Sequence, residues 1–328
     1  MSQKKKILIV SFNFPHPVNN GGAIAQSFFL DRLQSEFEVS FASVIKTQAD
    51  VRNFNKRFPS IQVFNLYEPG ADQGTSLFFR TKLYASRFLN RVRKKKPVQP
   101  VQDHLELDYI RNLVNLKTNG FVGQLDRVIK INKFEIIQFD FFETLDLAVL
   151  MPAGASTVFV SHELRSKRIR LASEHSNTST AYKNYLFDIT SAYEYELLKR
   201  FDRVVVFNAD DQQILESEGI NVSVSPYGIP SFMHVRQQPS DRFDKFIFIG
   251  GESHFPNKEG LTWFIDTIFL NLKAPHYPLH IIGEWSPEFK LRYAPHNNIR
   301  FAGAQEEIYP IFDNAILIAP ILSGAGLR

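Results

Sequence analysis

Cysteine is absent from this 328-residue sequence. Its absence excludes a disulfide framework, a cysteine nucleophile and thiolate metal ligands, and it is typical of proteins from a reducing compartment. Apolar runs are short, and none approaches the ~20 residues that cross a bilayer. The run after the first lysines breaks at FPHPVNN without a cleavage-site pattern, so it indicates a first β-strand and not a signal peptide. We therefore expect a cytoplasmic protein that could also lie on the inner face of the membrane.

Several motifs that define large enzyme classes are missing too. GxxxxGK[ST] is absent, which excludes a P-loop NTPase, and the absence of GxSxG argues against an α/β-hydrolase. HExxH and aspartates at D-x-D spacing are also absent, so we expect no metal. The 38 basic and 34 acidic residues leave a net charge of only +4, which does not indicate a nucleic-acid partner.

Short apolar runs alternate with longer amphipathic ones, which is typical of βαβ units and parallel sheets. The sequence therefore predicts an α/β protein with two Rossmann-like domains, residues 1–235 and 236–328. The expected strands are 6–12, 38–44, 61–66, 135–140, 156–162, 203–208 and 222–227, then 245–251, 279–284, 299–303 and 316–321. The expected helices are 23–36, 76–95, 104–132, 163–200 and 210–218, then 257–271 and short ones near 287–293 and 305–313. A strand and a glycine-rich turn normally lead into a helix, and the sequence stops at such a turn, so we expect the second domain to be incomplete.

The loop after the first strand ends in Gly21 and Gly22, at the entrance of a helix. It does not match GxGxxG, which disfavours nicotinamide or flavin binding in the usual manner. Adjacent glycines let backbone N–H groups approach an anion closely, with the helix dipole behind them. The alternative is a plain turn in which glycines begin the helix.

His162 ends the strand STVFVSH and is followed by a basic run that starts at Arg165. The carboxyl edge of a parallel sheet is where α/β proteins bind ligands. A histidine there can hydrogen-bond a sugar hydroxyl or stabilise developing charge, which makes His162 a candidate catalytic residue. The alternative is a loop histidine that caps the next helix.

Residues 76–96 carry eight basic side chains and no acidic one. Leucine, phenylalanine, tyrosine and valine side chains share one broad face of this expected helix. Such a basic amphipathic helix suits an anionic membrane surface or an anionic acceptor, and the alternative is a core-facing stripe with a solvated basic back. The basic residues are Arg80, Lys82, Arg87, Arg91, Arg93, Lys94, Lys95 and Lys96.

The order of elements and several motifs resemble retaining family-4 glycosyltransferases of the GT-B fold. In the first domain the matching stretches are PVNNGGA, YEYELLKRFDRVVVFNADDQQIL and VSPYGIP. In the second they are FIGGESHFPNKEGLTWF, LHIIGE and IRFAGAQEEIYPIFDNAILIAPILSGAGLR. The resemblance covers almost the whole chain. It implies a sugar transferred from a nucleotide-sugar donor, which is a co-substrate, with no cofactor and no metal.

The resemblance also implies roles for residues at the matching positions. Gly21 and Gly22 would lie against the diphosphate and sugar of the donor, and His162 would contact the transferred sugar. No side chain stands out as a nucleophile, which agrees with the family's front-face displacement.

In the second domain, Gly250, Gly251 and Asn257 would border the phosphates, and backbone around Gly303 and Ala304 would meet the nucleobase. The final turn would cradle the diphosphate, and the arginine at its end would neutralise it. This turn consists of Ser323, Gly324, Ala325, Gly326, Leu327 and Arg328.

The sequence departs from the family pattern at three places. Gly251 stands where many relatives have an arginine, and Tyr227 replaces the asparagine of the N-G motif. The E-x7-E motif, whose glutamates bind sugar and ribose hydroxyls, would follow the last residue. Glu135 and Glu143 have that spacing, but they lie in the first domain and the match is a coincidence. We therefore expect the sequence as it stands to be weakly active or inactive.

The implied function is transfer of a sugar to a cell-surface glycan or a lipid-linked acceptor. The competing class is a non-catalytic remnant that binds an acceptor, a membrane surface or a partner protein. A nucleotide-sugar epimerase shares the Rossmann layout, but it needs an early GxGxxG and a Y-x-x-x-K. Tyr182 is followed directly by Lys183, so that spacing is not met.

Overall fold

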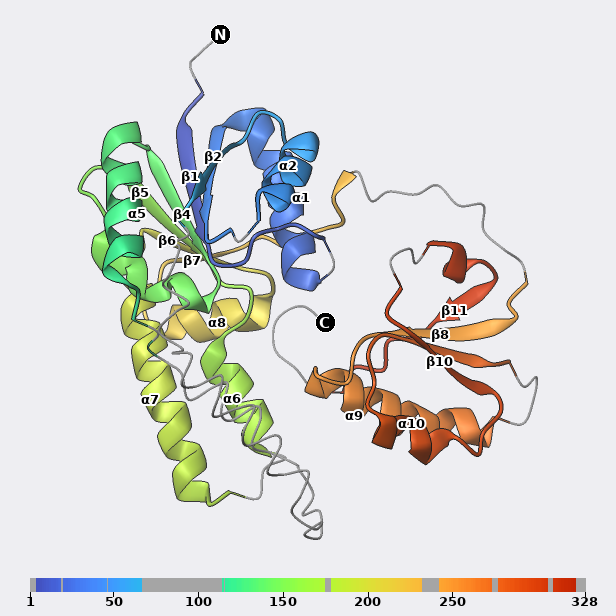
Figure 1. The fold of residues 1–328 in the computed structure, drawn as a ribbon. Helices are drawn as coiled ribbons and strands as arrows, with labels where there is room; N and C mark the ends of the chain where they lie inside the picture. Colours follow the sequence, from blue (N-terminus) through green and yellow to red (C-terminus); the bar gives the residue numbers. More distant parts are fainter. Residues whose placement is uncertain are drawn as a thin grey trace, which may run out of the picture. The chain divides into compact units, whose positions relative to one another are not determined.

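A computed structural model describes most of the chain (Figure 1). The described residues are 4–18, 20–45, 47–66, 114, 116–174, 178–231, 242–272, 277–305 and 309–322. They form two compact units that divide between residues 234 and 235.

The first unit is built on a seven-stranded sheet with the order β3-β2-β1-β4-β5-β6-β7, in which every pair is parallel. The strand order reverses at β1, and ligands of such sheets bind beside this point, at the carboxyl ends of the strands. The strands are β1 (Lys6–Ser11), β2 (Glu38–Ser43), β3 (Gln62–Asn65), β4 (Ile136–Asp140), β5 (Ser156–Val160), β6 (Arg203–Val206) and β7 (Val222–Val224).

Helices cover both faces of this sheet (Figure 1). Alternate residues of β1 point to opposite faces, so Ile9 packs with Leu30 and Phe54 from α1 and α2, while Leu8 packs with Leu125 from α5. Burial on both faces explains why the strands are nearly continuous apolar runs. The helices are α1 (Gly21–Glu36), α2 (Gln48–Arg57), α5 (Asn119–Asn132), α6 (Arg165–Glu174), α7 (Thr180–Leu198) and α8 (Ala209–Ser217), with the 3-10 helix η2 (Phe142–Leu150).

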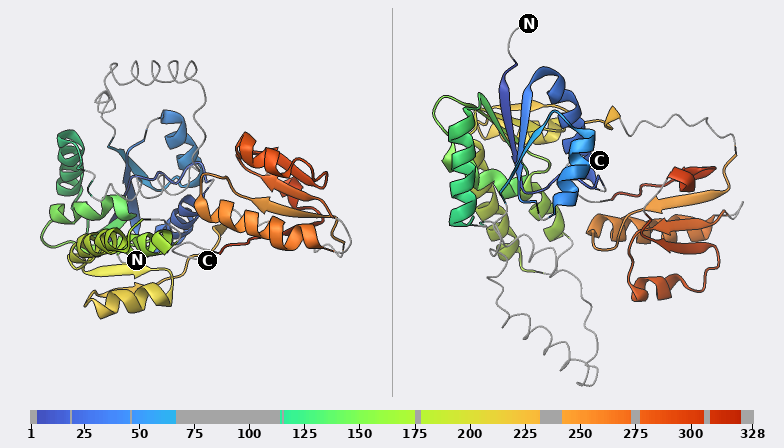
Figure 2. Two further views of the ribbon diagram at one scale, coloured as in Figure 1. Left: turned by 90° about the horizontal axis from the view of Figure 1, so that it is seen from below. Right: turned by 45° about the horizontal axis from the view of Figure 1, so that its top comes forward.

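The second unit holds a parallel four-stranded sheet with the order β10-β9-β8-β11 (Figure 2). Helices α9 and α10 pack on the same face of this sheet, around Phe248, Ile281 and Trp285. The strands are β8 (Lys245–Ile249), β9 (Leu279–Ile282), β10 (Ile299–Gly303) and β11 (Ala315–Leu317). The helices are α9 (Phe255–Trp263), its continuation as π-helix η4 (Phe264–Ile268) and 3-10 helix η5 (Phe269–Asn271), α10 (Pro287–Tyr293) and η6 (Tyr309–Phe312).

Two parallel Rossmann-like sheets confirm the predicted α/β fold class. The expected helix over 163–200 is wrong in one respect, because α6 and α7 are separate helices and the Ser179 side chain accepts a hydrogen bond from Tyr182 N to cap α7. The 3-10 helix η2 was not expected, and α5 begins at Asn119 behind its cap, Thr118. Of the helices that the structure describes, none is both long and apolar enough to cross a membrane.

Candidate functional site

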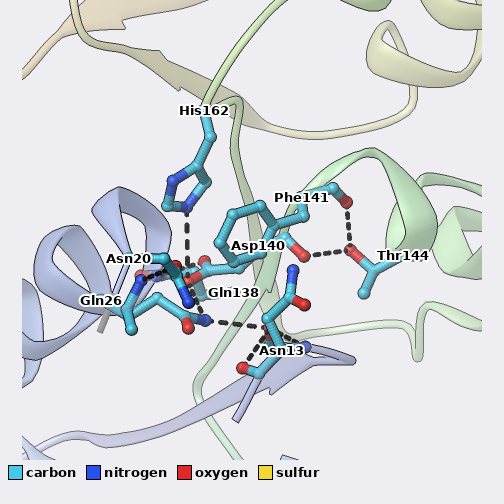
Figure 3. Close-up of polar contacts among 10 residues, drawn as sticks. Asn13, Asn20, Gln26, Gln138, Asp140, Phe141, Thr144 and His162 are labelled. Atoms are coloured by element: carbon cyan, nitrogen blue, oxygen red, sulfur yellow. Dashed lines mark hydrogen bonds and ion pairs between the residues drawn. The ribbon is translucent and has the colours of Figure 1, made fainter. Parts of the chain in front are cut away.

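The carboxyl ends of β1, β4 and β5 meet at one edge of the first sheet (Figure 3). Ser11 and Asp140, the last residues of β1 and β4, are partners in the register of the two strands. His162 follows the end of β5 by two residues. This edge lies beside the reversal of strand order, where the fold is expected to place a ligand.

Helix α1 begins at this edge with Gly21 and Gly22 as its first two residues. The Asn20 side chain caps the helix by accepting a hydrogen bond from Ala23 N at 2.9 Å. A Cβ atom at Gly22 would lie 2.9 Å from Cζ of Phe141, whereas nothing lies within 4 Å of a Cβ at Gly21. First-turn N–H groups have no carbonyl partner within a helix, so this N-terminus has the chemistry of an anion site.

Asp140 is the buried centre of the edge, with 2% of its surface exposed. Gln26 Nε2 donates to its Oδ2 atom at 3.1 Å and also to Ser11 Oγ at 2.9 Å. Gln138 Nε2 donates to Oδ1 at 2.8 Å. The Nε2 atom of His162 lies 4.0 Å from Oδ2, so the imidazole faces the carboxylate (Figure 3).

The His162 ring is held between two aromatic rings. Phe141 stacks on it with a centroid distance of 3.7 Å and an interplanar angle of 13°, and Phe207 meets it edge-on at 5.1 Å. Phe141 has a φ of 70° and a ψ of 152°, a backbone conformation that non-glycine residues rarely adopt. Thr144 fixes this turn, because its Oγ1 atom donates to the carbonyl oxygens of Asp140 and Phe141 at 3.0 and 2.9 Å.

The loop that carries His162 is anchored by Glu194, a buried residue of α7. Its carboxylate accepts hydrogen bonds from the N–H groups of Arg165 and Ser166, at 2.8 and 3.0 Å, and from Ser166 Oγ at 2.7 Å. Burial raises the pKa of Glu194, while these hydrogen bonds oppose the rise. Glu194 therefore caps α6, which begins at Arg165, three residues after His162.

The basic run after His162 is paired with carboxylates. Arg165 pairs with Glu143 at 3.0 Å, Lys167 with Asp211 at 2.6 Å, and Arg168 with Glu163 at 2.6 Å. The first two pairs join α6 to η2 and α8, and the third joins α6 to the loop before it.

A second glycine-lined edge lies at the carboxyl ends of β8, β9 and β10 in the second unit. Asn257 Nδ2 donates to the carbonyl oxygen of Gly251 at 3.2 Å, and a Cβ at Gly250 would lie 2.5 Å from the same Nδ2 atom. Gly303 has a φ of 72°, and the N–H of Ala304 donates to Glu284 Oε1 at 3.4 Å. The Asn257 side chain therefore fills the space beside Gly250, whereas nothing lies within 4 Å of a Cβ at Gly303.

The structure brings part of the predicted site together within each unit. Gly21, Gly22 and His162 share the edge of the first sheet, and Gly250, Gly251, Asn257, Gly303 and Ala304 share the edge of the second. Two predicted groups lie outside the described residues: Ser323, Gly324, Ala325, Gly326, Leu327 and Arg328, and the basic Arg80, Lys82, Arg87, Arg91, Arg93, Lys94, Lys95 and Lys96.

Sequence reasoning missed Asp140, Gln26, Gln138 and Phe141. The only signal in the sequence was weak, namely that Asp140 is a polar residue at the end of the apolar strand EIIQFD. Within the described part of the chain, no three histidine, aspartate or glutamate residues are grouped so that they could hold a metal ion.

No protein-family model and no curated protein matches the sequence. Solved structures do match the fold. TarM gives a TM-score of 0.56 at 12% identity, over 96% of this chain and 80% of TarM. Sucrose-phosphate synthase from Thermosynechococcus elongatus gives 0.56 at 11% identity, over 92% of this chain and 71% of the synthase.

A TarM variant from S. aureus, in complex with Fondaparinux, alpha-GlcNAc-glycerol and UDP, gives a TM-score of 0.53 at 11% identity. That match covers 92% of this chain and 78% of the variant. At these identities the likeness concerns the fold, and the chain has the GT-B fold of glycosyltransferases.

Proposed function

We propose that this chain acts in a retaining, metal-independent glycosyltransferase that moves a sugar from a nucleotide-sugar donor to a cell-surface glycan or a lipid-linked acceptor. The observation that carries the proposal is the edge of the first sheet. There the glycine-led N-terminus of α1 and the imidazole of His162 converge at the reversal of strand order. The GT-B fold and the UDP bound to the TarM variant support a nucleotide-sugar donor.

The α1 N-terminus suits the negative charge of the donor. Gly21 has open space where a Cβ would stand, so a phosphate or sugar oxygen can approach its backbone. His162 would hydrogen-bond a hydroxyl of the transferred sugar from the opposite side of this edge. In the second unit, the backbone at Gly250, Gly251 and Gly303 would receive the phosphates and the base.

Retention would follow from displacement on one face of the sugar. The bond between the anomeric carbon and the leaving phosphate oxygen breaks, and the acceptor oxygen bonds to the same face of that carbon. The acceptor hydroxyl proton moves to the departing phosphate oxygen, so the reaction needs no protein nucleophile. The protein would stabilise the developing diphosphate charge through backbone N–H groups.

The proposal is tested by calorimetric titration of the whole chain with UDP-glucose, UDP-N-acetylglucosamine and GDP-mannose, together with an assay of sugar release and transfer. We expect saturable binding of one donor class. His162→Ala should lower turnover by about 10–10³-fold while leaving the melting temperature unchanged. His296→Ala, which changes a histidine before β10, is the control and should keep wild-type turnover.

Two outcomes would decide against the proposal. If none of the three donors binds, the edge of the first sheet is not a donor site. If a donor binds but is neither hydrolysed nor transferred with any glycan or lipid-linked acceptor tested, the non-catalytic binding role is favoured. Turnover of His162→Ala within twofold of wild type would remove His162 from the site.

A further inference from the structure

Asp140 places a buried carboxyl group at this edge of the first sheet. Two side-chain amides, those of Gln26 and Gln138, each donate to a different carboxylate oxygen. A buried charge is costly unless hydrogen bonds or an opposite charge compensate it, and amides supply no charge. The third group that faces the carboxylate is the imidazole of His162, at 4.0 Å.

The side chains of Asp140 and His162 are each held in place by neighbouring residues. Gln26 lies in α1 and Gln138 in β4, and together they fix the orientation of the carboxylate. Phe141 stacks on the His162 ring and Phe207 meets its edge, so the ring plane is fixed as well. The side chain of His162 is 10% exposed, and among the described residues its Nε2 atom has no hydrogen-bond partner.

We propose that Asp140 is a positioning residue for His162: its carboxylate holds the ring proton on Nε2, which leaves Nδ1 as a hydrogen-bond acceptor. Figure 3 shows the other ring nitrogen, Nδ1, on the side of the ring away from Asp140. In this tautomer Nδ1 can accept a hydrogen bond from a ligand hydroxyl. The distance of 4.0 Å is about 1 Å longer than an N–H···O hydrogen bond. Such contacts often shorten only when the substrate binds.

The inference deepens the proposed function and rests on it for the catalytic consequence. A histidine with Nδ1 as acceptor would bind a sugar hydroxyl by receiving its proton, and would orient the sugar over the α1 N-terminus. The tautomer itself can be measured without any substrate, so the two proposals can fail separately.

The first experiment is ¹H–¹⁵N NMR of histidine-labelled whole protein, at a pH about two units above the ordinary histidine value of about 6.5. The signal of His162 is identified by its loss in His162→Gln. We expect the Nε2-protonated tautomer in the wild type and a mixture of tautomers in Asp140→Ala. Asp140→Asn keeps one carbonyl oxygen, so its fraction of the Nε2-protonated tautomer should lie between those of the wild type and Asp140→Ala. The asparagine variant remains informative if the alanine variant does not fold.

Asp211→Asn is the matched control, because Asp211 is also 2% exposed and hydrogen-bonded in the first unit but faces Lys167. It should leave the His162 spectrum unchanged. An unchanged His162 tautomer in folded Asp140→Ala or Asp140→Asn would overturn the inference, and so would the Nδ1-protonated tautomer in the wild type.

The second experiment is a double-mutant cycle on sugar release from the donor that binds. Asp140→Ala should lower kcat by about tenfold or more with little change in KM, and should cause no further loss in a His162→Ala background. Additive losses would mean that Asp140 acts apart from His162, and the inference would be wrong. If the wild type releases no sugar, the proposed function fails while the NMR result still decides the tautomer.

Discussion

The ring of Phe141 fills the space where a side chain at Gly22 would begin. A Cβ at Gly22 would lie 2.9 Å from Cζ and 3.0 Å from Cε1 of this ring. The same ring stacks on His162 at 3.7 Å, so one side chain connects the start of α1 with the imidazole. The left-handed φ of 70° at Phe141 brings the ring into this place.

Gly22→Ala should therefore disturb the site, although alanine favours helices. The new methyl group would push the Phe141 ring against His162, and overpacking of this kind costs about 1–3 kcal/mol. Gly21→Ala is the matched control, since nothing lies within 4 Å of a Cβ there. Thermal melts and the His162 NMR signal should change in Gly22→Ala and stay close to wild type in Gly21→Ala. Equal melts and equal spectra for the two variants would contradict this account.

The sheets could be predicted because parallel strands are buried on both faces. Residues such as Leu8 and Ile9 are fully buried on opposite faces, which leaves a continuous apolar run in the sequence. The position of His162 and of the glycine pair at the edge of the sheet could be predicted, because each comes in the connection that follows a strand. The break between α6 and α7 could have been predicted from the serine and threonine residues that precede Thr180.

Asp140 and Phe141 could not be predicted, because their roles depend on tertiary contacts. The register that places Asp140 beside Ser11 joins residues far apart in the chain, and Gln26 reaches the carboxylate only once α1 has packed. A left-handed backbone at a phenylalanine has no sequence signal, because a glycine would ordinarily stand there.

Glu194→Gln should destabilise the first unit by about 1–3 kcal/mol, because charge-assisted hydrogen bonds to the N-terminus of α6 are weakened. The variant should also loosen the loop of His162. Glu196→Gln is the control, since Glu196 is exposed on the same helix and pairs with neighbouring Lys199 at 2.7 Å. It should change stability by less than about 0.5 kcal/mol. Chemical denaturation measures both, and similar losses for the two variants would exclude the capping role.

Gly260→Ala should displace the segment that follows β11. A Cβ at Gly260 would overlap the carbonyl oxygen of Pro320. This oxygen belongs to the backbone, so no change of side-chain rotamer can relieve the overlap. We expect a loss of about 1–3 kcal/mol or more in the stability of the second unit, and weaker donor binding. In Gly123→Ala, the control in α5, nothing lies within 4 Å of the new Cβ, so stability should rise by up to about 1 kcal/mol. Calorimetry and donor titration of both variants test this, and wild-type melting of Gly260→Ala would refute it.

The basic residues of 76–96 lie outside the described residues, so their membrane role stays a prediction. Glutamine at Arg91, Arg93, Lys94, Lys95 and Lys96 should weaken co-sedimentation with phosphatidylserine vesicles by at least about a hundredfold, since each cation contributes about 1 kcal/mol near an anionic surface. Binding by the wild type should also fall with salt and be absent with phosphatidylcholine alone.

The control for this experiment removes five basic side chains from other places, namely Lys130, Lys133, Lys183, Lys199 and Arg200. It should sediment like the wild type. Equal loss in both variants would point to net charge, and unchanged sedimentation in the first would show that the segment does not contact lipid.

His280 should make the second unit less stable in acid. Burial lowers the pKa of His280, and the charges of Arg300 and Lys245 lower it further against an opposing effect of Asp244. A histidine whose pKa is lowered on folding stabilises the folded state fully at a pH above the pKa of the unfolded state, about 6.5. This stability is lost as the pH falls from that pKa through the pKa of the folded state. His280→Gln removes this titration, so its melting temperature should fall less than that of the wild type between pH 7 and pH 5. His296→Gln, which changes another histidine of the same unit, should keep the wild-type slope. Parallel pH profiles for the wild type and His280→Gln would show that His280 does not gain its proton on unfolding.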